Sequence, residues 1–424
     1  MIRFLFKGLL RDPSRSLFPV LIVSIGVMLT VFLQTWLKGA MGDVVRSNAG
    51  FSTGHVKIMS KAYAENKSQI PNDLALMGVE ELLFTLRDTH SDMVWVDRIR
   101  FGGLLDIPDE QGQTRAQGPA AGLAVDLLST QSPEIETLNI GKSIVRGRLP
   151  VKSGEILIGE EFADKLKVNP GDTTTLLSTT MNGSMSMQNF TIAGTIRFGV
   201  AAMDRGALVI DIADIRRALD MKNAAGELLG YFRDGLYHDA AAIQVAQVFN
   251  KQFAASDDIY APVMHALRDQ NGLGEYMDMA NYFSFIASGI FVAAMSIVLW
   301  NVGLIGGLRR YGEMGLRLAI GEDKRHVYGS LVIEALFVGI TGSIIGTALG
   351  LASAWYLQVH GVDIGSMMKN STMMMSNTVR AEITHVSFYI GFIPGMFSTV
   401  LGAALSGIGI YRRQTAQLFK ELET

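Results

Sequence analysis

The chain has 424 residues, of which 18% are charged, whereas an average soluble protein carries roughly 25%. Its formal net charge of −3 argues against a nucleic-acid-binding protein, and the absence of cysteine excludes disulfides, a thiolate nucleophile and a cysteine-ligated zinc site. A few membrane spans joined to one sizeable soluble domain would give this composition.

The N-terminal stretch predicts two elements. Residues 1–15 separate apolar from basic side chains at helical spacing, which predicts an amphipathic helix on the membrane surface. Residues 16–37 carry no charge and are long enough for transmembrane helix 1. The alternative is a cleaved signal peptide, but the apolar run is too long and no A-x-A cleavage site follows it.

Residues 38–278 predict a mixed α+β domain with its own core. "GEILIG" (154–159) predicts a strand and "EEFADKLKV" a short helix. "MNGSMSM" (181–187) is typical of a hairpin tip leading into the strand "NFTIAGTIRF", and residues 206–221 predict a strand followed by an amphipathic helix. The length of the segment leaves open an arrangement in two lobes.

The remaining chain alternates apolar and polar stretches. We therefore expect an α-helical membrane protein with four transmembrane helices and a large α+β domain between helices 1 and 2. The predicted segments are transmembrane helix 2 at 279–308, a hinge at 309–326, transmembrane helix 3 at 327–359, a methionine-rich loop at 360–385, transmembrane helix 4 at 386–411 and a tail at 412–424.

Basic residues in short segments beside spans predict the cytoplasmic side. They gather at the N-terminus, the hinge and the tail: Arg3, Lys7, Arg11, Arg15, Arg309, Arg310, Arg317, Lys324, Arg325, Arg412, Arg413 and Lys420. This bias predicts a multi-pass membrane protein with both termini and the hinge in the cytoplasm. The α+β domain would then be extracytoplasmic.

The hinge predicts a protruding knob. "RRYGEMGLRLAIG" favours a helix that breaks at Gly321, and "EDKRHVYG" favours a second helix with acids at its N-terminus, where the helix dipole stabilises them. A generic polar loop would not need so many small and apolar residues. The pattern indicates a surface that docks a cytoplasmic partner.

Transmembrane helix 3 carries two notable features. Gly342, Gly346 and Gly350 recur at a spacing of four, which puts them on one face and lets a second helix approach closely, within the subunit or at a subunit interface. Glu334 is the acid of this span, and a carboxylate there requires a partner or a position near the membrane surface.

No catalytic, cofactor or metal site is predicted in this chain, so we do not expect an enzyme. Gly141, Lys142 and Ser143 resemble part of a phosphate loop, but Glu136 stands where that loop needs its first glycine. The seven histidines are scattered along the chain.

Two methionine clusters leave three interpretations open: Cu(I) binding, adaptable packing and contact with a greasy substrate. The clusters are Met181, Met185 and Met187, and Met367, Met368, Met373, Met374 and Met375.

Arg310 with "GEMGLRLAIG" and the later "IEALFVGITGSIIGTALGL" resembles the signature R-x-x-E-I-G-I-x-x-A-I-G…E-x₇-G-x₃-G. That signature belongs to permease subunits of MacB/FtsX-like ABC transporters, including the lipoprotein-releasing LolC/LolE type. "FKGLLRDPSRSLFPVLIVSIGV" is similar to the family's N-terminal pattern, with Asp12 in place of the usual Asn. The C-terminal "P-A-x-R-A" stretch is replaced by "SGIGIYRRQTAQ".

The resemblance implies that the hinge is a coupling helix seated on a separate ABC ATPase dimer, which would bind ATP and magnesium. A second permease copy or paralogue, membrane lipids and a periplasmic carrier or membrane-fusion protein are the other implied partners. The implied coupling residues are Arg310, Glu313, Met314, Gly315, Arg317, Ala319 and Gly321.

Three functions follow as hypotheses. The first is extraction of lipoproteins or other amphiphilic cargo from the outer leaflet of the inner membrane. The second is efflux or mechanotransmission involving peptides, drugs or cell-wall enzymes. The third is a membrane-anchored sensor or scaffold without an ATPase, for which replacing Glu313 and Gly315 would leave function intact.

Overall fold

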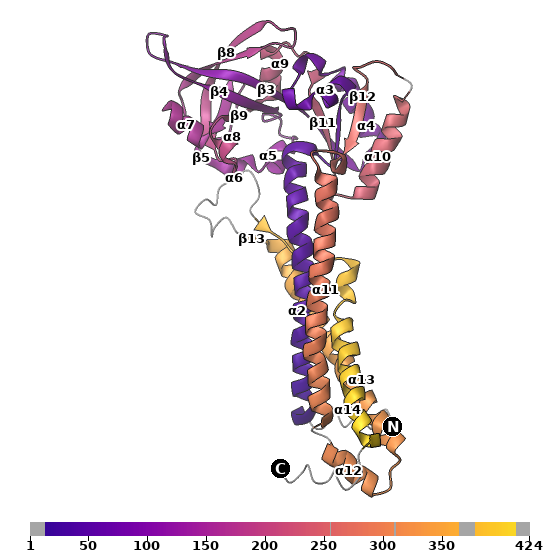
Figure 1. Cartoon of the computed structure of the whole chain (residues 1–424). Coiled ribbons are helices and arrows are strands. Elements are labelled where there is room, and N and C mark those ends of the chain that lie inside the picture. The colour runs from indigo at the N-terminus through magenta and orange to yellow at the C-terminus, as the bar shows by residue number, and fades with distance from the viewer. Residues whose placement is uncertain (1–12, 255, 309–310, 364–377, 413–424) are drawn as a thin grey trace. The chain divides into compact units, whose positions relative to one another are not determined.

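The structure, a computed structural model, describes residues 13–254, 256–308, 311–363 and 378–412 (Figure 1). The chain divides into two compact units. The helical unit comprises Met1–Asp43, Asp278–Val362 and Val379–Thr424, and the α+β unit comprises Val44–Met277 and Asp363–Thr378. The predicted surface helix lies largely outside the described residues, as does the second methionine cluster.

The described residues contain four helical segments long and apolar enough to cross a membrane, at Leu17–Thr53, Leu273–Leu308, Lys324–His360 and His385–Ile408. The predicted number of spans is thereby confirmed. The helices themselves are α2 (Pro13–Asn48), α11 (Leu273–Leu308), α12 (Tyr311–Ala319), α13 (Lys324–His360) and α14 (Thr399–Arg412), with the short helices η5 (His385–Phe388) and η6 (Ile393–Ser398) before α14.

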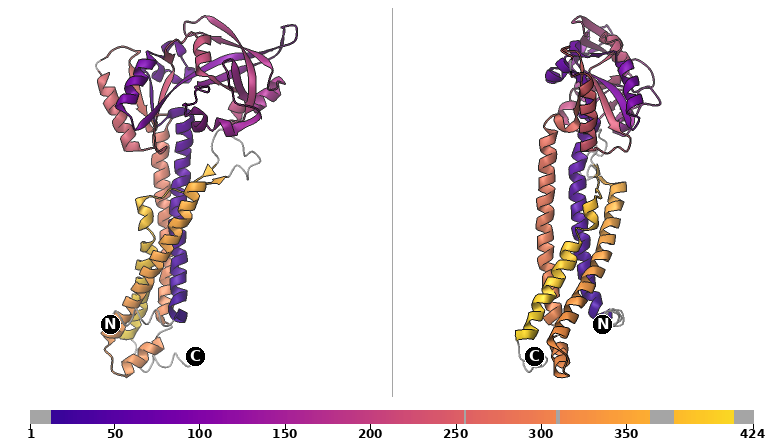
Figure 2. Two further views of the ribbon diagram at one scale, coloured as in Figure 1. Left: turned by 180° about the vertical axis from the view of Figure 1, so that it is seen from behind. Right: turned by 90° about the vertical axis from the view of Figure 1, so that its right-hand side faces the viewer.

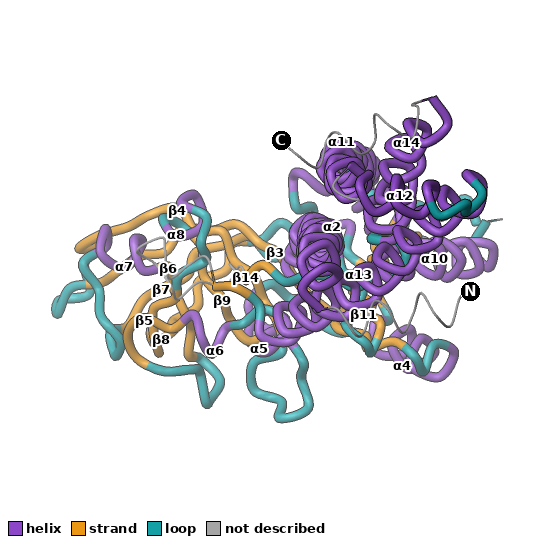
Figure 3. The backbone as a smooth tube through the Cα atoms, turned by 90° about the horizontal axis from the view of Figure 1, so that it is seen from below, coloured by secondary structure: helices purple, strands orange, loops and turns teal. Residues whose placement is uncertain are grey.

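Inside the helical unit, α2 and α11 run side by side, as both views of Figure 2 show. Val23, Val27 and Val31 of α2 pack with Leu299 of α11 in one buried cluster. The end-on view in Figure 3 shows α13 beside α2. Close packing between neighbours thus defines this unit.

The fourth span is irregular. Its first part is a 3-10 turn, and Pro394 lies at the start of the π-helix η6, which α14 then continues. Proline lacks a backbone N–H and cannot complete the regular helical ladder. A widened π turn accommodates such an interruption.

The α+β unit has, within the described residues of Val44–Met277, twelve strands: β1 (Val56–Ser60), β2 (Leu76–Met77), β3 (Met93–Pro108), β4 (Thr114–Val125), β5 (Ile144–Gly147), β6 (Glu155–Gly159), β7 (Thr173–Thr179), β8 (Met185–Ile196), β9 (Ala207–Asp211), β10 (Ala224–Ala225), β11 (Glu227–Phe232) and β12 (Pro262–Ala266). Its helices are η1 (Ala49–Thr53), α3 (Lys61–Glu65), η2 (Lys67–Gln69), η3 (Asn72–Leu74), α4 (Val79–Thr89), α5 (Glu134–Thr137), α6 (Ile140–Ser143), α7 (Glu160–Leu166), α8 (Ala201–Asp204), α9 (Ile212–Ala218), α10 (Asp239–Gln252) and η4 (Leu267–Asp269).

Ten of these strands form one sheet in which β3 is shared by two halves. Residues 93–98 of β3 pair with β11, and residues 99–108 pair with β4. In the second half, the pairings β3–β4–β9–β6–β8–β7–β3 close a ring of strands. The expectation of two lobes therefore corresponds to two halves joined by a single long strand.

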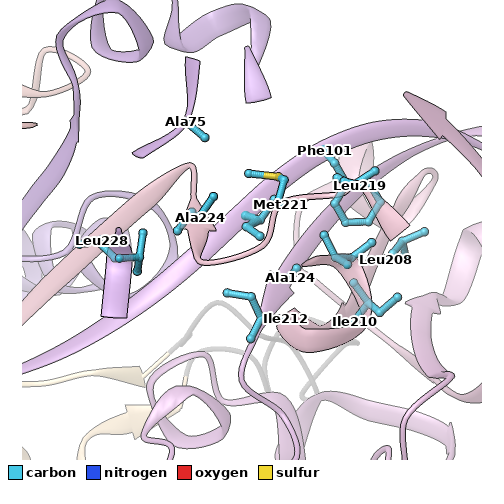
Figure 4. Packing of buried hydrophobic residues seen from close by; sticks show 14 of the residues in the cluster. Ala75, Phe101, Ala124, Leu208, Ile210, Ile212, Leu219, Met221, Ala224 and Leu228 are labelled. Atoms are coloured by element: carbon cyan, nitrogen blue, oxygen red, sulfur yellow. The ribbon is translucent and has the colours of Figure 1, made fainter. Parts of the chain in front are cut away.

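Alternating side chains of the ring strands separate into two buried clusters. Ile156 and Ile158 of β6 lie in the larger cluster, whereas Leu157 between them lies in the smaller one. Figure 4 shows part of the larger cluster, including Leu208 and Ile210 of β9. This period of two is the geometry of a strand covered on both faces. The strand and helix predicted at 154–168 are confirmed, with α7 ending at Leu166, and so are the strand and helix predicted at 206–221.

Candidate functional site

Helix α12 presents two different faces. Met314 is buried with Val327 and Leu331 of α13, and Leu318 packs against the same cluster. Leu316 and Ile320 are 56% and 77% exposed. Glu313 and Ala319 are also exposed, whereas Gly315 is buried. The helix is therefore seated on α13 by one face and offers the other to its surroundings.

The predicted break after this helix is confirmed. Gly321 has a φ of +97°, a left-handed conformation that favours glycine. Its N–H donates to Leu318 O at 3.1 Å, and Glu322 N–H donates to Arg317 O at 3.0 Å. These bonds satisfy carbonyls at the end of α12. Asp323 is the N-cap residue of α13, although its side chain makes no capping hydrogen bond.

Arg317 connects α12 to α13. Its Nη1 donates to Ser330 Oγ at 3.0 Å, and its Nε lies 3.8 Å from a carboxylate oxygen of Glu322. His326 Nε2 lies 3.7 Å from the other oxygen of that carboxylate. Arg317 thus braces the turn from within the chain.

The predicted coupling residues consequently divide by orientation. Met314, Gly315 and Arg317 hold α12 in place, Gly321 makes the turn, and Glu313 and Ala319 lie on the exposed side. Arg310 lies outside the described residues. The sequence reasoning missed Leu316 and Ile320, whose exposure could not be read from an alternation of small and apolar residues.

Glu334 lines a cavity of about 60 Å³ inside the helical unit. Residues of α2, α11, α13 and α14 form its wall: Pro19, Val23, Val302, Gly303, Gly306, Gly307, Leu331, Ala335, Val338, Thr399 and Ala403. The cavity exceeds the roughly 10–15 Å³ that one water molecule needs. A carboxylate beside such a space within apolar spans is characteristic of a functional position.

The glycine stripe of α13 faces α2. A Cβ on Gly342 would lie 2.6 Å from Val23 Cγ1, and one on Gly346 would lie 2.4 Å from the carbonyl oxygen of Ser24. A Cβ on Gly350 would lie 2.8 Å from the Cβ of Val31. The three glycines therefore allow backbone-to-backbone approach within one subunit.

The other sequence candidates lie in the α+β unit. Met185 and Met187 are exposed on β8, and Met181 packs against the larger core cluster. Gly141, Lys142 and Ser143 belong to the short helix α6. Within the part of the chain that the structure describes, no three or more His, Asp or Glu side chains form a group that could hold a metal ion.

Residues 285–415 match the family model described as FtsX-like permease C-terminal. This chain carries an FtsX-like permease domain. Helix α12 lies wholly within the matched residues. The residues lining the Glu334 cavity also lie within them, except Pro19 and Val23. The recognition made from the hinge and glycine motifs is confirmed.

Proteins similar to this chain include the lipoprotein-releasing system transmembrane protein LolC of Xylella fastidiosa, 25% identical over 49% of this chain and 50% of that protein. The macrolide export ATP-binding/permease protein MacB of Brucella abortus is 26% identical over 31% of this chain and 20% of that protein. The chain thus spans half or less of these curated relatives. The crystal structure of the periplasmic region of MacB from Actinobacillus actinomycetemcomitans matches 54% of this chain and 95% of that chain, with a TM-score of 0.37 and 11% identity.

Proposed function

We propose that this chain is the non-catalytic transmembrane subunit of an ABC transporter and that α12 docks onto a separate ATPase dimer. The observation that carries the proposal is the two-faced seating of α12, with Leu316 and Ile320 exposed opposite a buried face. Exposed apolar side chains on a short, well-braced helix suit insertion into a groove of a partner. ATP and magnesium would bind to that partner.

Displacement of α12 would reach the spans through contacts within the helical unit. Met314 and Leu318 pack on α13, and Arg317 bonds to it. The glycine stripe then holds α13 closely against α2. Since close-packed helices move together rather than deform, a push on α12 would shift α13 and α2.

The charge bias supports an inner-membrane orientation with both termini and α12 in the cytoplasm and the α+β unit outside. In this orientation a cytoplasmic ATPase could drive movements on the opposite side. We expect the complete assembly to contain two permease chains and two ATPase chains.

The cargo that we favour is a lipoprotein or another amphiphile taken from the outer leaflet, with a periplasmic carrier as a further partner. The LolC relatives support this choice. The MacB relatives favour a second candidate, an efflux or mechanotransmission permease with a membrane-fusion partner. Lipopeptide bound to the chain purified from native membranes would distinguish them.

The docking proposal is tested with Leu316→Asp combined with Ile320→Asp. Two carboxylates on the exposed face should reduce the ABC ATPase recovered with the tagged chain at least about tenfold, because burying each unpaired charge is unfavourable. The measurement is co-purification from native membranes, with partners identified by mass spectrometry. Gly315→Trp is less informative, because Gly315 is buried and the indole would disturb α12 itself.

The control is Val151→Asp, which places one carboxylate on an apolar residue 69% exposed in the α+β unit. It should leave ATPase recovery unchanged. Recovery of the native chain without any ATPase would refute the proposal, and so would undiminished recovery with the double variant.

A further inference from the structure

The helix that begins as α2 ends inside the α+β unit in the π-helix η1. Gly54 N–H closes the last turn on Ala49 O at 2.9 Å. The final carbonyls of a helix lack donors from within the helix and form the negative end of its dipole. Ala49 O is satisfied by Gly54, so the carbonyl oxygens of Gly50 and Phe51 are the ones that require other donors, preferably cationic ones.

Two arginines and a tyrosine provide these donors. Arg98 Nη2 donates to Gly50 O at 2.9 Å and Nη1 donates to Phe51 O at 3.0 Å. Arg100 Nη2 also donates to Phe51 O at 3.0 Å. Tyr231 Oη lies 3.2 Å from both Ala49 O and Gly50 O. We call Arg98, Arg100 and Tyr231 the helix-end clamp.

Buried carboxylates balance the charge of the clamp. Arg98 is fully buried and pairs with Glu134 through bonds of 2.8 and 2.7 Å. Glu227 lies 3.4 Å from Arg100 and 2.9 Å from Lys57. Burial favours the neutral acid, but these cations outweigh it and lower the pKa of Glu227. The Glu227 carboxylate is therefore ionised and pairs with both Arg100 and Lys57.

The clamp lies at the junction of the two sheet halves. Arg98 is the last residue shown paired with β11, opposite Glu227, and Ile99 is the first paired with β4, opposite Ala124. The start of α11 is attached to the same helix end. Gln270 Nε2 lies 3.4 Å from Thr53 O, and Leu273 packs in one cluster with Ala49.

We propose that Arg98 is a positioning residue which, with Arg100 and Tyr231, fixes the end of α2 to the junction of β3, so that displacement of α2 enters the α+β unit. Without the clamp, a π turn, whose hydrogen bonding is less regular than that of an α-helix, could unwind and absorb the displacement. This inference rests on the proposed function, because it assumes that α2 moves.

The attachment can be measured in the full chain without ATPase or cargo. Since the sequence contains no cysteine, spin labels can be placed at Val44→Cys on α2 and Val151→Cys in the loop between β5 and β6, at positions 41% and 69% exposed. The native background should give one narrow distance distribution. Arg98→Met should broaden it at least about twofold.

Two further variants separate attachment from general damage. Arg216→Met removes an arginine that pairs with Asp97 at 2.6 Å and donates to Ala224 O, away from η1, and it should leave the width unchanged. Tyr231→Phe removes a donor without unbalancing buried charge, and it should broaden the distribution. A merely structural role would lower the unfolding temperature but leave the width of the folded population unchanged.

A broad distribution in the native background would overturn the inference, and so would an unchanged width in Tyr231→Phe, whether or not Arg98→Met folds. ATPase recovery with the tagged chain should stay at the native level in Tyr231→Phe. Absence of any ABC ATPase from the purified native chain would instead refute the proposed function. The failure of the inference and the failure of the proposed function are therefore distinguishable.

Discussion

His55 is a buried group whose ionisation is coupled to folding. It is 3% exposed, and its Nδ1 accepts a bond from Phe232 N–H at 3.0 Å. The rings of Tyr231 and Phe232 lie 5.6 and 5.3 Å from its own. Burial lowers the pKa of His55 to about 4, with Asp234 opposing and His238 and Arg46 reinforcing the shift.

This pKa predicts a loss of stability in mild acid. The unfolded chain would protonate His55 near pH 6.5 and the folded chain only near 4, so stability is complete above 6.5 and falls as the pH drops towards 4. The free energy of unfolding should be about 2 kcal/mol lower at pH 5 than at pH 8 from this group. Thermal unfolding followed through Trp fluorescence measures it, and His55→Gln should reduce the difference. An equal pH dependence in both chains would contradict the assignment.

At the scale of elements, the contact between α13 and α2 depends on the absence of side chains. Gly346→Ala would place a Cβ 2.4 Å from Ser24 O and 2.7 Å from Val27 Cβ. Because that backbone cannot yield as a flexible side chain does, we expect destabilisation of about 1–3 kcal/mol. Gly329→Ala on the same helix meets nothing within 4 Å and should stabilise it by about 0.5–1 kcal/mol. Unfolding temperatures of the full chain in detergent should shift in opposite directions, and a parallel shift would refute this packing.

At the scale of the whole molecule, the proposed orientation puts α12 and β8 on opposite sides of the membrane. Single cysteines at His326 and Met185 can test this, because the chain has no cysteine of its own. An impermeant maleimide should label the Met185→Cys chain in intact spheroplasts and the His326→Cys chain only after permeabilisation. Labelling of both from the same side would remove the basis for a cytoplasmic ATPase partner.

Local patterns made much of this molecule predictable. The four spans, the strands in 154–211 and the break at Gly321 follow from runs, alternation and turn residues within short windows. The helix α12 was predicted too, but which of its sides faces α13 depends on tertiary contacts such as those of Met314.

The clamp was missed for a different reason. Arg98 and Glu134 are 36 positions apart, and Tyr231 and Ala49 are 182 apart. No periodicity links such residues. A charged side chain in a strand most often faces water, so nothing local distinguishes Arg98, which is fully buried, from an ordinary surface arginine.

The sixteen-residue strand β3 is the backbone of both sheet halves. Because neither half has its own copy of that strand, disorder starting in one would fray the ladder of the other, and the two should melt cooperatively. By the same thermodynamic linkage, a molecule that binds the ring formed by β3, β4, β9, β6, β8 and β7 would alter the dynamics of the half that contains β11, β1 and β12. The two halves are therefore expected to unfold and to respond to ligands as one unit, and the larger buried cluster also spans both of them.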